Sequence, residues 1–378
     1  MPAAASGPGR AGRGGGRLTV GAEEEYLLVD PVSRALSPAA EKVVAEAGSE
    51  LGDRVTTEVT RYQVEVRTDP HTRLADFADQ VRSMRRTVAR AAARHGLSVI
   101  STGTPVLAHP MPPPLTEGRR YAESAARFGA LDDEQSVCAS HFHVGVPDVE
   151  TALHVSNHLR PWLPTLIALA ANSPYWQGHD TGHASWRTVT WARWPAAGPP
   201  PYFASRAHFE DLIADLTATG AVMDRGGLYW DIRPSHHLPT LEVRVADAVC
   251  TAQDTLLLAA VVRALVATAL ADIEAGTPPF RPQPEMLRSA CWRAAHDGLA
   301  GSGVDLHTRR LVPAALLIEH LLKRLAPALQ RHGDLDSVRT GWARLRADGN
   351  GADRQRAAYR TRRSLTDVID HLVNALQQ

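Results

Sequence analysis

The chain is short of lysine: of its 41 lysine and arginine residues, only Lys42 and Lys323 are lysine. Nearly every positive charge is therefore an arginine, a bias that genomic base composition explains most simply. The 41 acidic residues balance the basic ones, so the formal net charge is zero. Because nucleic acids and anionic membranes attract proteins with an excess of positive charge, neither is expected to be the main partner.

Cysteine is also scarce, and long apolar runs are absent. Cys138, Cys250 and Cys291 are too few and too scattered for a disulfide framework or a CxxC zinc site, which predicts a cytoplasmic location. No run of about 18 apolar residues indicates a membrane span. The most apolar stretch, TLLLAAVVRALVATALADI, contains Arg263 and predicts a buried helix. Residues 1–16 lack the apolar segment of a secretory signal and are predicted to be a disordered leader.

Familiar phosphate-binding and nucleophilic motifs are missing as well. The sequence contains no GxxxxGK[ST] loop and no well-placed GxGxxG, so neither a P-loop nor a Rossmann nucleotide site is supported. No Ser-His-Asp or Cys-His arrangement is evident, and Cys138 is predicted to be a small buried apolar residue. A nucleotide, if one binds, must therefore be held through metal ions and arginines.

Helical and extended patterns alternate in the first half of the chain, and the last third is helical. Apolar residues recur at helical spacing from Leu74 until Gly96 ends the pattern. Two prolines interrupt a helical pattern over residues 149–172, and from residue 252 onward the sequence predicts helix after helix. Because nothing resembles a linker, residues 17–378 are predicted to form one α+β domain.

Four predicted strands carry ionisable residues on one face. They are TVGAEEEYLLVD, YQVEVRT, HFHVGV and TLEVRVAD, in which polar residues alternate with apolar ones. Successive strand residues point to opposite faces, so an antiparallel sheet covered by helices on one side gives this pattern. An ordinary half-exposed strand explains any one segment, but if the four are neighbours they place one set of residues on one face: Glu23, Glu25, Glu65, His143 and Glu242.

Two glutamates do not fit this simple alternation. Glu24 points away from Glu23 and Glu25, and nothing in the sequence identifies what satisfies its charge. Glu58 is seven residues before Glu65, a spacing that puts the two on opposite faces of one continuous strand. Glu58 therefore joins the site only if a turn or bulge separates them.

So many carboxylates on one face cannot remain ionised together without cations. Oxygen-rich ligand sets without cysteine favour Mg²⁺ or Mn²⁺ over Zn²⁺, and such cations commonly serve phosphate substrates. An HxH strand with distant carboxylates also suits a zinc hydrolase, which stays open as an alternative although glutamate outnumbers histidine. Four further histidines are predicted to be loop or packing residues: His179, His183, His236 and His237.

Five segments resemble the bacterial carboxylate–amine ligases, also called type 2 glutamate–cysteine ligases. In chain order they are GAEEEYLLVD, EVTRYQVEVRTDP, ASHFHVGVPD, NSPYWQGHDTGHASWR and YWDIRPSHHLPTLEVRVAD. The CAS sequence before His141 departs from the glycine-containing version common in that family. The resemblance implies a fold like the ligase half of glutamine synthetase-type enzymes, an antiparallel sheet curved into a funnel with helices packed on its outer face.

The resemblance also implies roles for individual residues. The implied metal ligands are Glu23, Glu25, Glu58, Glu65, His143 and Glu242. Arg244 is implied to contact phosphate and, with Glu65, to be catalytic. Arg187 and Arg233 are implied to contact substrate or nucleotide.

The implied activity joins glutamate to an amine such as cysteine, with ATP and Mg²⁺ or Mn²⁺, through an acyl phosphate. A catalytically degenerate homologue that binds amino acid or nucleotide without turnover is the alternative outside catalysis, and the intact carboxylates argue against it. Nothing in the sequence identifies a cysteine pocket, so the identity of the amine stays open, as does a homodimer.

Overall fold

The computed structural model of the chain describes residues 16–378, so all but the last position of the predicted leader lies outside it. Its principal sheet has the strand order β2-β3-β1-β5-β9-β8, with β4 paired to β1. Every pairing in this sheet is antiparallel. The strands are β1 (Val20–Val29), β2 (Val55–Thr57), β3 (Gln63–Arg67), β4 (Ser98–Ile100), β5 (Ala139–Gly145), β8 (Ile232–Pro234) and β9 (Thr240–Asp247).

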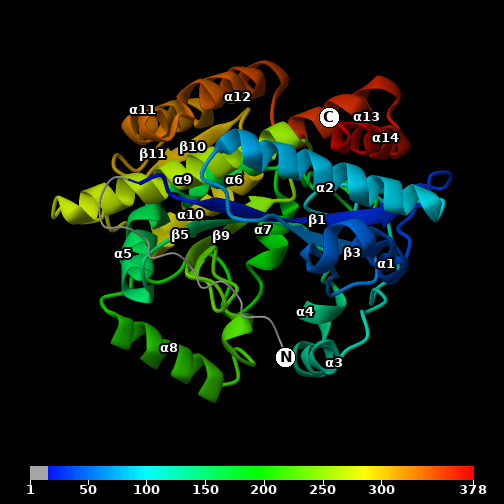
Figure 1. Ribbon diagram of the computed structural model, residues 1–378, viewed down its shortest axis with the longest axis horizontal. Coiled ribbons are helices and arrows are strands. Elements are labelled where there is room, and N and C mark those ends of the chain that lie inside the picture. Colours follow the sequence, from blue (N-terminus) through cyan, green and yellow to red (C-terminus); the bar gives the residue numbers. More distant parts are fainter. Residues whose placement is uncertain (1–15) are drawn as a thin grey trace, which may run out of the picture.

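Helices cover the two faces of the sheet unequally (Figure 1). Helices α2 and α9 pack directly on β1, and α9 also contacts β5, while α11 and α12 pack on the outer side of α9. The opposite face carries α3, α4, α7 and α8. The helices are α1 (Ala40–Leu51), α2 (Leu74–Arg94), α3 (Arg119–Phe128), α4 (Ala130–Asp133), α5 (Val149–Leu159), α6 (Leu163–Ala170), α7 (Trp186–Trp191), α8 (Arg206–Ala218), α9 (Ala252–Glu274), α10 (Pro284–Asp297), α11 (Ala314–His332), α12 (Leu335–Asp348), α13 (Gly351–Arg362) and α14 (Leu365–Leu376).

The principal hydrophobic core lies between the sheet and the helices that pack on the same face as α9. Val20, Phe142 and Val243, from three neighbouring strands, belong to one buried cluster with the apolar residues of α9. Helix α9 is long and apolar enough to span a membrane, but 67% of its most apolar window is buried inside the protein. Arg263 within it is fully buried and donates to Asp334 at 2.6 Å. The predicted buried helix is therefore confirmed.

The α+β class and the antiparallel sheet are confirmed, with one correction in the last third. Residues 302–313 are not helical: β10 (Ser302–Asp305) and β11 (Arg310–Pro313) form a hairpin between α10 and α11. The turn contains Arg309 at a φ of 58°, a left-handed conformation that ends any helix. The kink predicted over residues 149–172 is present, since a short 3₁₀ turn at Arg160–Trp162 separates α5 from α6.

Glu24 has its hydrogen-bond partners on the face of the sheet that α2 and α9 cover. The carboxylate is buried and accepts hydrogen bonds from Arg85 at 2.5 and 3.1 Å, from Thr255 at 2.6 Å and from Tyr26 at 2.6 Å. Burial alone would raise the pKa of Glu24, but the Arg85 charge and the hydrogen bonds from Arg85, Thr255 and Tyr26 together outweigh burial and lower it. Glu24, which breaks the alternation of polar and apolar residues in β1, thus links the sheet to α2 through Arg85 and to α9 through Thr255.

Replacing Arg85 by methionine should destabilise the protein by about 3–5 kcal/mol, because it leaves Glu24 as a buried charge without its counter-ion. The matched control is Arg82→Met on the same helix, whose partner Asp79 is 81% exposed and whose loss should cost less than about 1 kcal/mol. Urea unfolding of both variants measures the difference. Equal losses of unfolding free energy in the two variants would show that the buried Arg85–Glu24 pair contributes no more than the exposed Arg82–Asp79 pair.

Candidate active site

The register of the sheet brings the predicted ligands together on the face opposite Glu24. Glu25 on β1 lies opposite Glu65 on β3, and His143 on β5 lies opposite Glu242 on β9. Glu23 pairs across β1 and β5 with His141. The four charged strands are therefore neighbours, which meets the condition that the sequence analysis set for a common site.

Glu58 reaches the same face because it belongs to a different strand segment from Glu65. Strand β2 pairs antiparallel with β3, with Thr56 opposite Glu65. Glu58 follows two residues later and therefore points to the side of the sheet that Glu65 occupies. The turn between β2 and β3 supplies the break that the odd spacing requires.

Glu25, Glu58 and Glu65 form a carboxylate cluster, with one oxygen of each within 4.8 Å of the others. Burial, reinforced by the charge of Glu58, raises the pKa of Glu25 to about 8. Burial also raises the pKa of Glu58, and burial together with Glu23 raises that of Glu65 well above its ordinary value. The cluster therefore has more negative charge than its surroundings neutralise, which is the environment that a hard cation relieves.

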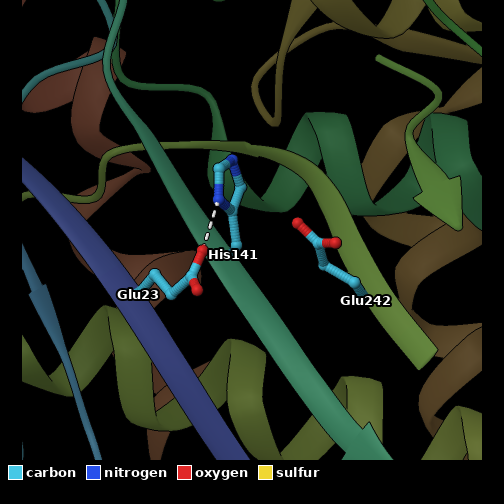
Figure 2. A group of neighbouring side chains, drawn as sticks. All are labelled: Glu23, His141 and Glu242. Atoms are coloured by element: carbon cyan, nitrogen blue, oxygen red, sulfur yellow. Dashed lines mark hydrogen bonds and ion pairs between the residues drawn. The ribbon is translucent and has the colours of Figure 1, made fainter. Parts of the chain in front are cut away.

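A second group consists of Glu23, His141 and Glu242, which also offer ligand atoms within 4.8 Å of one another. Figure 2 shows the three side chains converging from β1, β5 and β9. His141 Nδ1 lies 3.1 Å from Glu23 Oε2. Burial and the nearby Arg244 lower the pKa of His141 to about 4, so the imidazole is neutral and able to bind a metal ion.

Two arginines neutralise the second group. Arg233 donates to both oxygens of Glu242, at 2.7 and 3.3 Å, and Arg244 donates to Oε1. Burial acts to raise the pKa of Glu242, but Arg244 and Arg233 outweigh it and hold the pKa well below its ordinary value. Burial acts to raise the pKa of Glu23 as well, but the neighbouring His141 and His143 outweigh it and hold that pKa well below its ordinary value. The face thus has one half in which arginines pair with Glu242 and another in which the described residues form no ion pair with the carboxylate cluster.

His143 lies beside this second group but is not part of it. Its Nδ1 is 2.9 Å from Thr240 Oγ1, and its Nε2 is 3.4 Å from Glu23 Oε1 without another hydrogen-bond partner. His141, which the sequence analysis did not name as a ligand, occupies the position between Glu23 and Glu242. Strand alternation placed both histidines on this face, so the signal for His141 was present.

Arg187 enters the site from α7 and is almost fully buried. Its guanidinium donates to the backbone carbonyls of Arg244 at 3.0 Å and Val245 at 3.3 Å, while Nε has no partner. Among the described residues it forms no ion pair with a carboxylate. Arg187 therefore differs from Arg233 and Arg244 in having no carboxylate at ion-pair distance, although the charges of Asp247, Glu25 and Asp231 act on it from farther away.

Most of these groups line a cavity of about 300 Å³, but the predicted ligands His143 and Glu242 are not among its lining residues. The carboxylates and arginines come from the sheet and α7, and the remaining wall comes from α3, α4 and the segments that carry Trp194 and Tyr229. The four histidines predicted to be loop or packing residues do not line it. Cys138 is buried with its Sγ 3.4 Å from Gln63 Nε2, and burial raises the pKa of its thiol well above the ordinary value. Its predicted role as a buried apolar residue agrees with this.

Comparison with known proteins places this chain in a family. Residues 19–373 match the profile described as glutamate–cysteine ligase family 2 (GCS2). The chain belongs to glutamate–cysteine ligase family 2. It is 45% identical over 357 residues to a protein of Saccharopolyspora erythraea provisionally named glutamate–cysteine ligase 2-1, covering 94% of each chain. It is 47% identical over 358 residues to a protein of Mycobacterium sp. strain KMS provisionally named glutamate–cysteine ligase 2-2, covering 94% of this chain and 98% of that one.

Two solved structures share the fold of this family 2 chain. The glutamate–cysteine ligase of Francisella tularensis in complex with AMP has a TM-score of 0.71 at 14% identity, covering 96% of this chain and 89% of that one. A bifunctional glutathione synthetase from Pasteurella multocida has a TM-score of 0.71 at 13% identity, covering 96% and 52%. At these identities the likeness shows the fold, in agreement with the ligase-type sheet that the resemblance implied.

The carboxylate cluster predicts that the metal-free protein loses stability as pH rises. A folded-state pKa of about 8 for Glu25, against an ordinary 4.5, means that its stabilising contribution is complete below pH 4.5 and is lost as pH rises through 8. In chelator, we expect the melting temperature to fall between about pH 5.5 and about pH 8.5. The fall should be smaller in Glu25→Gln, whose amide has no proton to lose in this range and so gains no negative charge.

Mg²⁺ or Mn²⁺ should reverse that loss, by about 2.7 kcal/mol at a concentration 100 times Kd. Glu25→Gln should abolish most of this stabilisation, whereas Glu123→Gln, an exposed carboxylate of α3 paired with Arg119, should retain it. Thermal unfolding with and without the ions measures both effects. Equal ion-induced stabilisation in the two variants would show that the cluster does not bind these cations.

Proposed function

We propose that this protein is an ATP-dependent carboxylate–amine ligase that joins the γ-carboxylate of glutamate to an amine, with cysteine as one acceptor. One observation carries the proposal: a family 2 chain holds an unneutralised carboxylate cluster and an arginine without an acidic partner around one cavity. The names of the relatives support glutamate and cysteine as substrates. The AMP bound to the Francisella protein supports use of an adenine nucleotide.

The residues present fit Mg²⁺ or Mn²⁺. One ion would be held by Glu25, Glu58 and Glu65, whose raised pKa values reflect missing positive charge. Another would be held by Glu23, Glu242 and a histidine. The unpartnered Nε2 of His143 makes it a candidate beside His141. When bound, such ions neutralise phosphate charge and orient the phosphate oxygens.

The arginines are suited to the anionic groups of the substrates. Arg187 has no carboxylate partner among the described residues, so its guanidinium is available to a substrate carboxylate or phosphate. Arg244 has an unpartnered Nε and lies next to Glu242, where it would contact the transferring phosphoryl group. We assign Glu65 to the catalytic centre through its place in the carboxylate cluster, and Arg233 to substrate or nucleotide contact.

The proposed reaction has two balanced steps. An oxygen of the glutamate γ-carboxylate attacks the γ-phosphorus of ATP, and the bond to ADP breaks, giving an acyl phosphate. The amine nitrogen then attacks the acyl carbon, phosphate leaves with the electron pair of the carbon–oxygen bond, and the nitrogen releases its extra proton. No covalent bond to the enzyme is needed, which agrees with the absence of an activated nucleophile among the described cavity residues.

We also propose that the protein is cytoplasmic. The three cysteines are buried and unpaired, which is compatible with the proposed cytoplasmic location. A homodimer stays a prediction that sedimentation can test.

Loss of either half of the ligand set should abolish turnover. Glu25→Ala and Glu242→Ala should each remove glutamate- and Mg²⁺-dependent release of phosphate from ATP, because each removes a proposed ligand. The assay combines ATP, glutamate and a panel of amines, and scores phosphate release and product mass. Glu123→Ala is the control, expected to keep wild-type turnover. Full activity in both site variants would refute the metal site, and amide cleavage by a zinc-loaded, nucleotide-free protein would favour the hydrolase.

Arg244→Lys should lower kcat by at least about tenfold, equivalent to about 1.4 kcal/mol of transition-state stabilisation. Lysine preserves the charge beside Glu242 but not the planar fork that grips a phosphoryl group. The melting temperature should change little, since the ion pair with Glu242 can be kept. Near-normal kcat, or a loss of activity that follows unfolding, would show that Arg244 serves only to orient Glu242.

A further inference from the structure

Arg187 is held against the sheet although it forms no ion pair. Its guanidinium donates to the backbone carbonyls of Arg244 and Val245 on β9, and its carbon lies 5.9 Å from the centre of the Trp191 ring. Its Nε has no hydrogen-bond partner, and the side chain lines the cavity. The position of this guanidinium therefore depends on how α7, which carries it, is fixed to β9.

A buried carboxylate at the end of β9 fixes the start of α7. Asp247 is the last residue of β9 and is 1% exposed. Its Oδ1 accepts a hydrogen bond from Ser185 Oγ at 2.8 Å. Its Oδ2 accepts from Ser173 Oγ at 2.7 Å and from the backbone N–H of Asn172 at 2.8 Å. Both oxygens are therefore occupied within the protein, and Asp247 is not itself a ligand-binding group.

The two serines connect Asp247 to Arg187. Ser185 is the N-cap of α7, where its Oγ accepts from the backbone N–H of Thr188 at 3.2 Å. Ser173 Oγ accepts from the backbone N–H of Arg187 itself at 3.0 Å. Such contacts satisfy the backbone donors that the first turn of a helix leaves free. By ordering both hydroxyl groups, Asp247 holds the turn of α7 from which Arg187 projects.

Asp247 and Arg187 also compensate each other's charge without forming an ion pair. Burial lowers the pKa of Arg187, and among the charges that oppose burial, that of Asp247 acts most strongly. Burial raises the pKa of Asp247, and the charge of Arg187 is the strongest effect that opposes it. Because opposite charges attract over longer distances where water is excluded, each residue favours the ionised form of the other.

A direct ion pair would have a different consequence for the arginine. Arg233 and Arg244 both donate to Glu242, so part of their hydrogen-bonding capacity is used within the protein. At Arg187 the serine hydroxyls occupy the carboxylate instead, and the guanidinium keeps an unpartnered Nε. This arrangement fixes a charged arginine at the cavity and leaves it able to bind an anionic group.

We propose that Asp247 is a positioning residue, which orients Arg187 toward an anionic group of the substrates, a glutamate carboxylate or an ATP phosphate. It acts through Ser173 and Ser185 and touches neither substrate. The identity of the two ligands rests on the proposed ligase function. The coupling of Asp247 to Arg187 rests on the contacts alone, so binding and turnover are measured separately.

Calorimetric titration of the full chain with glutamate, and separately with ATP and Mg²⁺, tests the coupling. Arg187→Met should weaken binding of one of the two by at least about tenfold, which identifies the group that Arg187 contacts. Asp247→Asn should weaken binding of the same ligand by at least about fivefold. When Arg187→Met is already present, adding Asp247→Asn should change that Kd by less than about twofold, because the residue through which it acts is gone.

Asp334→Asn is the matched control. Asp334 is likewise 1% exposed, but it pairs with Arg263, and neither residue lines the cavity. This variant should lower the melting temperature and change both dissociation constants by less than about twofold. If Asp247→Asn does not fold, Ser185→Ala replaces it, keeping the charge but removing one hydrogen bond to Asp247. It should weaken binding of the same ligand by at least about threefold.

The proposal is overturned if Arg187→Met weakens neither ligand, if Asp247→Asn (or Ser185→Ala in its place) binds both like the wild type, or if its effect is equally large with and without Arg187. A chain that shows the coupling but releases no phosphate from ATP with glutamate and amines would support the positioning role and refute the ligase function. A wild-type chain that binds neither ligand would refute the ligase function and, with it, this role. In an active enzyme, Asp247→Asn should raise KM for the ligand of Arg187, while Asp334→Asn should leave it unchanged.

Discussion

Carboxylates of Glu25, Glu58 and Glu65 lie within ligand distance of one another on a sheet face where burial disfavours their ionised forms. Without protons or cations, this cluster repels itself, and each pKa rises in response. The sheet nevertheless holds the three side chains together because the backbone pairing of β1, β2 and β3 leaves them no other direction. The site is therefore built at a cost in stability that a bound cation would offset.

Charge on the rest of the sheet is balanced within the protein. Glu242 is held between Arg233 and Arg244, and Glu24, on the opposite face of β1, is held by Arg85. Three consecutive glutamates of β1 thus have different surroundings. Glu24 links the sheet to its covering helices, Glu23 lies in a group that contains arginine-paired Glu242, and Glu25 lies in a carboxylate cluster where burial and Glu58 raise its pKa to about 8. The contrast shows that the imbalance at Glu25 is local and not a general property of the fold.

The cavity combines this charged sheet face with a wall from distant parts of the chain. Helices α3 and α4 bring Tyr121 and Asp132, and the segments after α7 and before β8 bring Trp194 and Tyr229. The sheet supplies the carboxylate cluster and two arginines, and the wall supplies aromatic rings and a buried carboxylate.

Sequence alone determined which residues share a face of each strand, because side-chain direction follows from the alternation of neighbouring backbone units. It therefore predicted Glu23, Glu25, Glu65, His143 and Glu242 as one set, and the family resemblance added Glu58 and the arginines. Only tertiary structure decided how strands pair and what packs on them. Register put His141 between Glu23 and Glu242, the β2–β3 turn brought in Glu58, and α2 supplied Arg85, 61 residues from Glu24. Asp132 and the aromatic wall had no sequence signal, because contacts between residues far apart in the chain depend on packing that no local pattern encodes.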